Sequence, residues 1–228
     1  MKKVIFTFLV VLLVSPAALS VKRSDEVERL RRATEVLREI MRTPDKGIPG
    51  DLLDKSECVA IVPGLKKAGL GIGGKYGKGL VMCRQGKKIW SAPSFITIEG
   101  GSVGFQIGVQ QTDVVMLIMN RKGIDKLIDD KFTLGADASV AAGPVGRDAS
   151  AQTNVRLDAE ILTYSRAKGL FAGVSLSGAT LRQDKDDNRD FYGKEMDARA
   201  ILLGGTVPMP VEAKPLAAAL SRESPRKR

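Results

Sequence analysis

Residues 59–84, VAIVPGLKKAGLGIGGKYGKGLVMCR, alternate short apolar runs with glycine-rich turns, and this pattern decides the fold class. The apolar residues recur with a period near two, which is typical of β-strands rather than helices. The same pattern continues as far as residue 119. We therefore predict a series of strands at Val59–Val62, Leu70–Lys75, Gly79–Arg84, Phe95–Glu99, Gly104–Val109 and Asp113–Met119, with a turn at Lys87-Lys88.

The second half of the chain predicts more β-structure. Residues 136–145 are mostly small, which suits a strand in close contact with another backbone. Residues 157–166 and 170–183 predict a hairpin that turns at Lys168-Gly169. A short helix is expected at residues 123–130 and a last core segment at residues 198–203.

Two polar segments are expected to lie outside the core. The charged stretch at residues 183–190, which holds Asp184, Asp186, Asp187 and Asp190, predicts a solvated acidic loop. After Gly205 the chain is rich in Pro and Ala and ends in three basic residues, so residues 206–228 predict a flexible basic tail.

One amphipathic helix precedes the strands. Ser24 is a candidate N-cap, and Thr43-Pro44 ends the helix. Its apolar residues recur at helical spacing: Val27, Leu30, Ala33, Leu37, Ile40 and Met41. Its arginines could place it on an anionic membrane, whereas most amphipathic helices pack on their own domain. The fold class is therefore α+β: a large antiparallel sheet, open or barrel-like, with this helix and one or two short helices.

The first twenty residues have the order of a secretory signal. Lys2 and Lys3 precede the apolar run Val4–Val14, and Ala18-Leu19-Ser20 offers a cleavage site after Ser20. We expect residues 1–20 to be a signal peptide, with an uncleaved anchor as the alternative. The protein is then exported, either periplasmic or secreted, and free or peripheral to a membrane.

Export changes how the two cysteines are interpreted. In an oxidising compartment Cys58 and Cys83 could form a disulfide that closes a loop of about 25 residues. The alternative is two separate buried thiols.

The sequence argues against several functional classes. Gly100–Gly104 matches the G-x-S-x-G motif of serine hydrolases, but the chain has no histidine to act as the base. Gly69–Gly74 matches a dinucleotide fingerprint but is followed by a turn instead of a helix. Histidine ligands are absent and the cysteines do not form paired motifs, so we expect neither a metal nor a cofactor. The formal charge of +10 favours an anionic partner, but no aromatic stripe indicates nucleic acid.

Several long strings resemble the SYLF-domain family, which comprises lipid-binding, actin-associated proteins. The matching strings are residues 68–74, Trp90–Pro93, 100–108, 134–147 and 164–173, within a likeness that covers residues 28–205. The resemblance implies a SYLF-like domain over residues 21–205. Eukaryotic members are associated with phosphoinositide binding through a basic N-terminal helix and with actin organisation, whereas bacterial members are exported.

The leading functional hypothesis is a non-enzymatic domain that binds anionic phospholipid or a lipid-like ligand at a membrane surface in the cell envelope. The resemblance carries the binding role to the arginines of the helix, and three lysines near it are added as candidates: Arg29, Arg31, Arg32 and Arg38, with Lys66, Lys67 and Lys75. The first alternative is an envelope structural or protein-interaction module without a lipid ligand, whose protein partner is unknown. The second is an enzyme that uses carboxylates such as Asp137, Asp158 and Glu160.

Overall fold

The structure is a computed structural model that describes residues 17–42, 47–85, 89–145, 159–167, 170–173 and 176–224. Within these ranges the backbone alone is described at residues 17–22, 70–72, 102–108, 167 and 170–173. The apolar run Val4–Val14, the turn at Lys87-Lys88 and the end of the tail lie outside the described residues.

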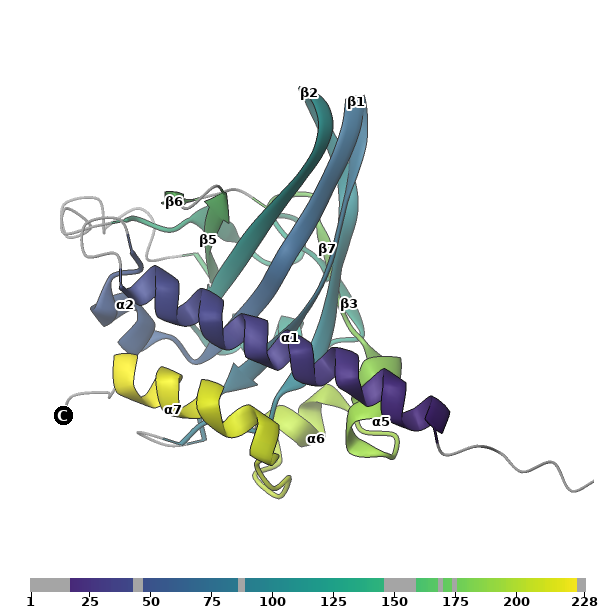
Figure 1. The fold of residues 1–228 in the computed structure, drawn as a ribbon. Coiled ribbons are helices and arrows are strands. Elements are labelled where there is room, and N and C mark those ends of the chain that lie inside the picture. The colour runs from purple at the N-terminus through teal and green to yellow at the C-terminus, as the bar shows by residue number, and fades with distance from the viewer. Residues whose placement is uncertain are drawn as a thin grey trace, which may run out of the picture.

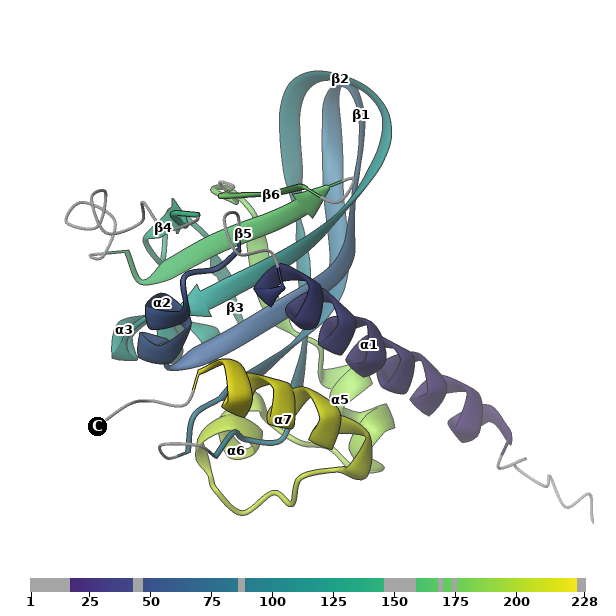
Figure 2. The same cartoon turned by 60° about the vertical axis from the view of Figure 1, so that its left-hand side comes forward.

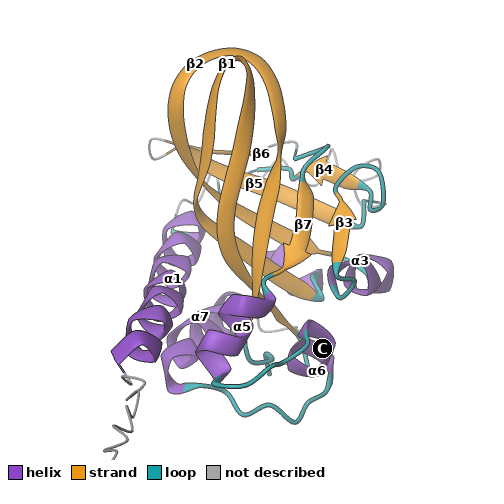
Figure 3. Ribbon diagram, turned by 90° about the vertical axis from the view of Figure 1, so that its right-hand side faces the viewer, coloured by secondary structure: helices purple, strands orange, loops and turns teal. Residues whose placement is uncertain are grey.

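Two long strands dominate the molecule. The six short strands predicted between residues 59 and 119 merge into β1 (Cys58–Cys83) and β2 (Ser94–Ile118). These pair antiparallel over almost their whole length, from Cys58 opposite Ile118 to Val81 opposite Ser94. Both strands bend over at mid-length, so that β1 forms an inner arch and β2 an outer one (Figure 3).

The bend brings the two halves of β1 side by side. Cys58 and Cys83 are joined by a disulfide with their Cα atoms 4.0 Å apart, which resolves the alternative that the sequence left open. A Cβ at Gly77 would lie 2.8 Å from side-chain atoms of both Val62 and Leu65, so the close approach requires glycine there. We call the upper part of this double strand, residues 65–76 and 99–112, the arch.

Shorter strands extend the sheet on both sides of the double strand. β7 (Thr180–Gln183) pairs with the first half of β2 and β5 (Ile161–Ala167) with its second half. Beyond them lie β3 (Lys131–Thr133), β4 (Val140–Ala142) and β6 (Leu170–Gly173). The described sheet has seven strands, which are antiparallel except for β4 against β5, and it curls into a half-barrel. The predicted α+β class with a barrel-like sheet is confirmed.

The chain forms more helices than predicted, and most lie below the arch. They are α1 (Ala17–Met41), α2 (Gly50–Lys55), α3 (Arg121–Leu127), α5 (Lys185–Tyr192), α6 (Ala198–Leu203), the 3-10 turn η2 (Val211–Ala213) and α7 (Lys214–Glu223). α1 runs diagonally across one face of the sheet with α7 beside it (Figures 1 and 2). α1 begins before Ser24, so the predicted cap at that residue is wrong.

The sheet separates two cores because side chains alternate along each strand. On the face under α1, Val59 and Ile61 pack with Leu30, Leu37 and other buried residues of the helix. On the inner face, Ala60 and Val62 pack with residues from β3, β7, α3 and α6. The apolar stripe of α1 is therefore buried in its own domain, as is usual for amphipathic helices.

The predicted acidic loop is wrong. Residues 185–192 form α5, and the side chain of Asp184 accepts a hydrogen bond from the backbone N–H of Asp187, which caps the helix. Gly193 closes the helix with a φ of 70°. Asp184 and Asp187 are buried rather than solvated.

The predicted flexible tail is also wrong for residues 206–224. α7 buries Leu216 and Leu220 in the same core as α1. Arg84 fixes the end of this helix, because its buried guanidinium donates hydrogen bonds to the carbonyls of Ser56 and Ser224 and lies 4.5 Å from the ring centre of Trp90. The folded domain therefore extends well past residue 205.

Candidate functional site

The three lysines predicted to bind lipid lie on the arch but on opposite faces of it. Lys66 lines a cavity that it shares with α1, whereas Nζ of Lys75 lies 3.5 Å from the carbonyl oxygen of Ser177, beside the inner core. Burial lowers the pKa of Lys75, and the nearby charge of Lys67 lowers it further. Lys67 and Lys75 are therefore neighbours on the inner face, across the strand from Lys66.

The four arginines of α1 are not equivalent. The side chain of Arg29 is only 12% exposed, is paired with Asp187 at 2.6 Å, and stacks over Phe95. Arg31 is exposed but pairs with Glu28 and Glu35 on its own helix. Arg32 and Arg38 are exposed, and among the described residues no hydrogen bond or ion pair engages either side chain. Arg29 is therefore part of the fold, and Arg32 and Arg38 are the arginines available to a ligand.

Arg32 lies over a backbone irregularity in β1. The pairing of β1 with β2 shifts register between Val62 and Leu65, and Gly64 in this bulge has a φ of 66°. A Cβ at Gly64 would lie 2.7 Å from Nη2 of Arg32. The N–H of Gly64 donates a hydrogen bond to Asp113 at 2.9 Å. The left-handed backbone angle therefore favours glycine here, and a Cβ at this position would displace the guanidinium of Arg32.

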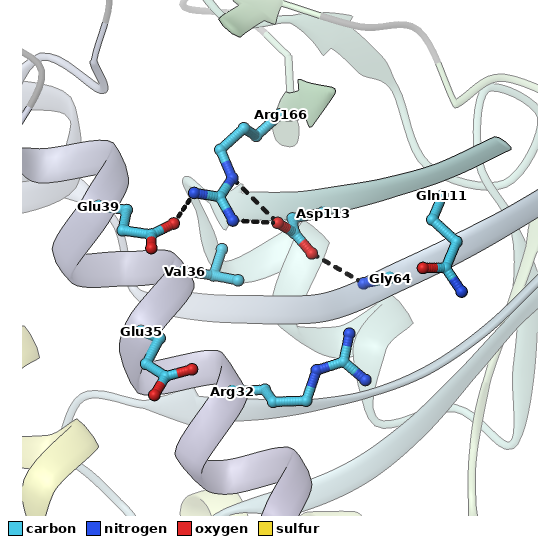
Figure 4. Close-up of a pocket in the computed structure, with 8 residues that line it drawn as sticks. All are labelled: Arg32, Glu35, Val36, Glu39, Gly64, Gln111, Asp113 and Arg166. Carbon is cyan, nitrogen blue, oxygen red and sulfur yellow. Dashed lines mark hydrogen bonds and ion pairs between the residues drawn. The ribbon is translucent and has the colours of Figure 1, made fainter. Parts of the chain in front are cut away.

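A groove separates α1 from the arch. Its larger part is a cavity of about 430 Å³ whose lining includes Arg32, Glu39, Asp113 and Arg166 (Figure 4). There Arg166 is held by ion pairs with Asp113, at 2.8 Å, and with Glu39. A second cavity of about 320 Å³ also includes Arg32 and Gly64 in its lining. We call the two together the α1–arch groove.

Beneath the second cavity lies a buried cluster of charges that joins α1, β1 and α5. Nζ of Lys78 lies 3.0 Å from Asp184 and 2.7 Å from Asp187. Burial acts to raise the pKa of Asp184, but hydrogen bonds from the Asp187 N–H, the Thr97 hydroxyl and Lys78 outweigh it, so this pKa lies below its ordinary value. Burial acts to lower the pKa of Lys78, but the hydrogen bonds and negative charges of Asp187 and Asp184 outweigh it, so this pKa lies above its ordinary value.

Glu26 lies at the edge of the same cluster. Glu26 is only 2% exposed, and its Oε2 has no hydrogen-bond partner among the described residues. Burial raises the pKa of Glu26, and the negative charges of Asp187 and Asp190 raise it further. This cluster is the electrostatic contact that docks α1 onto α5.

Two exposed apolar side chains of the arch were not predicted. Tyr76 is 47% exposed and lines the second cavity, and Val109 is 73% exposed. In the sheet Lys66 lies opposite Gln111 and Ala68 lies opposite Val109, so Val109 is close to Lys66 on the arch. The sequence gives only a weak hint, because Tyr76 is the one aromatic residue in a stretch of β1 made of Gly, Lys and aliphatic residues.

The alternative sites have structural roles. Gly100–Gly104 lies within β2, so no helix follows its serine. The carboxylates of Asp137 and Glu160 accept hydrogen bonds from the backbone of Thr133 and Ser139 respectively, and Asp158 lies outside the described residues. No cluster of three or more His, Cys, Asp or Glu that could hold a metal occurs among the described residues. In the same residues, no helix is both long and apolar enough to cross a bilayer.

The chain is similar to a family of eukaryotic binding proteins. Residues 99–223 match the family model Ysc84, described as Las17-binding protein actin regulator. SH3 domain-containing YSC84-like protein 1 of Homo sapiens is 36% identical over 192 residues, which is 82% of this chain and 56% of that protein. The same protein of Rattus norvegicus is 35% identical over an equal span.

A fungal relative matches over a shorter span. LAS seventeen-binding protein 3 of Saccharomyces cerevisiae is 37% identical over 169 residues, or 73% of this chain and 37% of that protein. The chain thus spans about half the length of the animal relatives and a smaller part of the yeast one. Because the identity exceeds 30% over most of the chain and the family model covers more than half of it, the chain belongs to the Ysc84 family, the family of SYLF domains.

Proposed function

We propose that this protein is a non-enzymatic domain that binds anionic phospholipid at a membrane surface through its arch. The observation that carries the proposal is a set of cations around a projecting double strand: Lys66, Lys67 and Lys75 on the arch, with Arg32 beside it. Basic residues near an anionic membrane each contribute about 1 kcal/mol of attraction. Tyr76 and Val109 add exposed apolar surface at the same place.

The manner of binding differs from immersion of an amphipathic helix. The apolar stripe of α1 is buried against the sheet and α7, so the helix would have to leave the domain to insert it into lipid. The arch needs no such rearrangement, because the double strand of β1 and β2 rises above the helical layer (Figure 1). Arg32, in the α1–arch groove, and Arg38, exposed on α1, contribute while the helix stays docked.

The envelope is the proposed location. Cleavage after Ser20 would keep the contacts that α1 makes from Arg23 onward. Arg23 itself donates hydrogen bonds to the carbonyl of Phe191 and to the carboxylate of Glu212. The buried disulfide fits an oxidising compartment. The disulfide supports export, with the protein at the periphery of a membrane, and the contacts of Arg23 would survive cleavage after Ser20.

A second candidate is a protein-interaction module. The matching family is described as an actin regulator that binds Las17, which is a statement about protein partners of its members. An envelope protein of the same fold could present its sheet or helices to a partner without any lipid. This candidate predicts a stable protein complex and indifference to vesicles.

Co-sedimentation with vesicles tests the proposal. We expect the protein to pellet with vesicles of phosphatidylglycerol and phosphatidylcholine but not with phosphatidylcholine alone. Pelleting should fall between about 0.1 M and about 1 M salt, because the Debye length shrinks from about 10 Å to about 3 Å.

Charge reversal at two places provides the matched comparison. The triple variant Lys66→Glu, Lys67→Glu and Lys75→Glu should no longer pellet. The control with Lys122→Glu, Lys126→Glu and Lys131→Glu makes the same change in net charge on α3 and β3, away from the arch. Equal loss in both triple variants, or no pelleting of the unmodified protein with anionic vesicles, would overturn the proposal.

A further inference from the structure

We propose that Arg32 and Lys66 form a clamp for a single phosphodiester group in the second cavity of the α1–arch groove. This inference rests on the proposed lipid-binding function and names the chemical group that the groove recognises. The two side chains come from different elements, α1 and β1, and line the same cavity of about 320 Å³. No described residue forms an ion pair or a hydrogen bond with the side chain of either.

The position of Arg32 is built into the backbone. The bulge at residues 62–65 and the left-handed conformation of Gly64 create the space over which the guanidinium lies. An arginine that served only solubility would need no such bulge beneath it. The planar guanidinium presents several N–H donors in the geometry that suits two phosphate oxygens.

Lys66 and Tyr76 complete the cavity from the arch. Both are exposed at the surface and line the cavity with Arg32. Lys66 supplies a second positive charge with three N–H donors, and the Tyr76 hydroxyl is a further donor. The Tyr76 ring also offers an apolar surface beside the phosphate, where the glycerol of a headgroup would lie.

The other cations of the cavity already have carboxylate partners. Arg29 and Lys78 are paired with Asp187 and Asp184. Of the carboxylates in the lining, Glu28 shares Arg31 with Glu35, and no described residue pairs with the side chain of Asp25. Arg32 and Lys66 are therefore the two lining cations available to a ligand, and a singly charged phosphodiester meets less repulsion from Glu28 and Asp25 than a dianionic phosphomonoester does.

The neighbouring cavity does not compete for the same role. Its arginine, Arg166, is held by Asp113 and Glu39, and Gln111 is neutral (Figure 4). Figure 4 shows the Arg32 guanidinium below Gly64 and apart from the group of Arg166, Asp113 and Glu39, with no dashed line to any of the residues drawn. The clamp therefore lies at the junction of the two cavities, with Arg32 as its centre.

Titration of the full-length protein with a soluble headgroup tests the clamp. The probe is glycerophosphoglycerol, a phosphodiester without acyl chains, and binding is followed through the backbone amide signals of Gly64, Lys66 and Gly77. We expect saturable shifts, with a dissociation constant raised about fivefold by Arg32→Ala and about fivefold by Lys66→Ala. Lys122→Ala and Arg199→Ala, on α3 and α6, are the matched controls and should leave the dissociation constant unchanged.

Inorganic phosphate distinguishes a headgroup from free phosphate. Weaker binding of inorganic phosphate than of glycerophosphoglycerol is expected, and equal or tighter binding would overturn the assignment to a phosphodiester. Shifts that do not saturate, or a dissociation constant unchanged in Arg32→Ala while the variant keeps the wild-type circular dichroism spectrum, would overturn the clamp itself.

Vesicles separate this inference from the proposed function. If the protein binds anionic vesicles and the two clamp variants bind them equally well, the clamp is wrong and the proposed function stands. If glycerophosphoglycerol binds in the groove but anionic vesicles do not bind the protein, the clamp stands and the proposed function is wrong.

Discussion

Burial of Glu26 opposes the ionisation of its carboxyl in the folded protein. Its pKa is raised above the ordinary value of 4.5 by burial and by Asp187 and Asp190, while Arg29 acts in the opposite direction. Because the folded pKa exceeds the unfolded one, stability falls as the pH rises through the folded pKa. Ionisation of Glu26 therefore weakens the contact between α1 and α5 at neutral pH.

Glu26→Gln is expected to stabilise the protein at pH 7 by about 1 kcal/mol, because a neutral amide replaces a buried charge whose oxygen lacks a partner. The gain should shrink as the pH falls toward 4.5, because the folded carboxyl, whose pKa is raised above that value, takes up its proton on the way. Urea denaturation at both pH values measures it. Glu28→Gln, an exposed position on the same helix, should change little, and a Glu26→Gln variant less stable than the parent at pH 7 would contradict this account.

Gly64→Ala tests whether the guanidinium of Arg32 packs on the backbone at Gly64. An L-residue with a φ of 66° costs roughly 1–2 kcal/mol, and the new Cβ would also displace the guanidinium. Urea denaturation should show a loss of at least that size, and a smaller loss when Arg32→Ala is already present. Gly101→Ala is the control, because no atom lies within 4 Å of its added Cβ. Equal losses in both backgrounds would show that Arg32 does not rest on Gly64.

The sequence predicts only in part which basic side chains are exposed to a ligand. The sequence identifies the basic residues of α1, but Arg29 is removed from the surface by Asp187, which is 158 positions away. Nothing local in the helix distinguishes Arg29 from Arg32. The bulge that supports Arg32 likewise depends on how β1 pairs with β2, and short-range patterns do not fix that register.

At the scale of elements, the disulfide holds the two ends of β1 together. Under the chain-entropy account, closing a loop of 25 residues stabilises the folded state by about 3.5 kcal/mol. Reduction should lower the free energy of unfolding by about that amount, measured by urea denaturation with and without reductant. The variant Cys58→Ala with Cys83→Ala should be insensitive to reductant, and an equal response in that variant would contradict the assignment.

The elements that the sequence predicts well are those with strong local patterns. The apolar spacing of α1 and the period of two in β1 and β2 were sufficient to predict a helix and a β-rich core. The sequence did not show that six short strands are two long ones, because the glycine-containing residues 76–79, where one predicted strand ends and the next begins, look like a turn. They lie instead within the continuous strand β1.

The wrong predictions of an acidic loop and of a flexible tail both rested on composition. α5 and α7 are short helices in polar or Pro- and Ala-rich sequence, so composition alone indicates a loop and a tail. Asp184 with Asp187 gives a local capping signal for α5 that outweighs the charge of the segment. α7 is held by tertiary contacts, through Leu216, Leu220 and the carbonyl of Ser224, which local propensity does not reveal.

For the whole molecule, the arrangement of layers predicts how the protein meets a membrane. The arch projects on one side, and α1 and α7 cover one face of the sheet below it (Figure 2). A membrane that contacts Lys66, Tyr76 and Val109 would therefore meet the arch first. The core under α1 would remain closed to lipid.

Hydrogen exchange of the backbone amides, measured with and without anionic vesicles, tests most directly whether the arch binds the membrane while α1 stays docked. The account predicts slower exchange at residues 65–76 and 99–112 on vesicles, with the exchange of α1 residues 23–41 unchanged because the helix stays docked. Faster exchange in α1, or protection gained in α1 while the arch is unaffected, would show that the helix leaves the domain to bind lipid and would contradict the central claim.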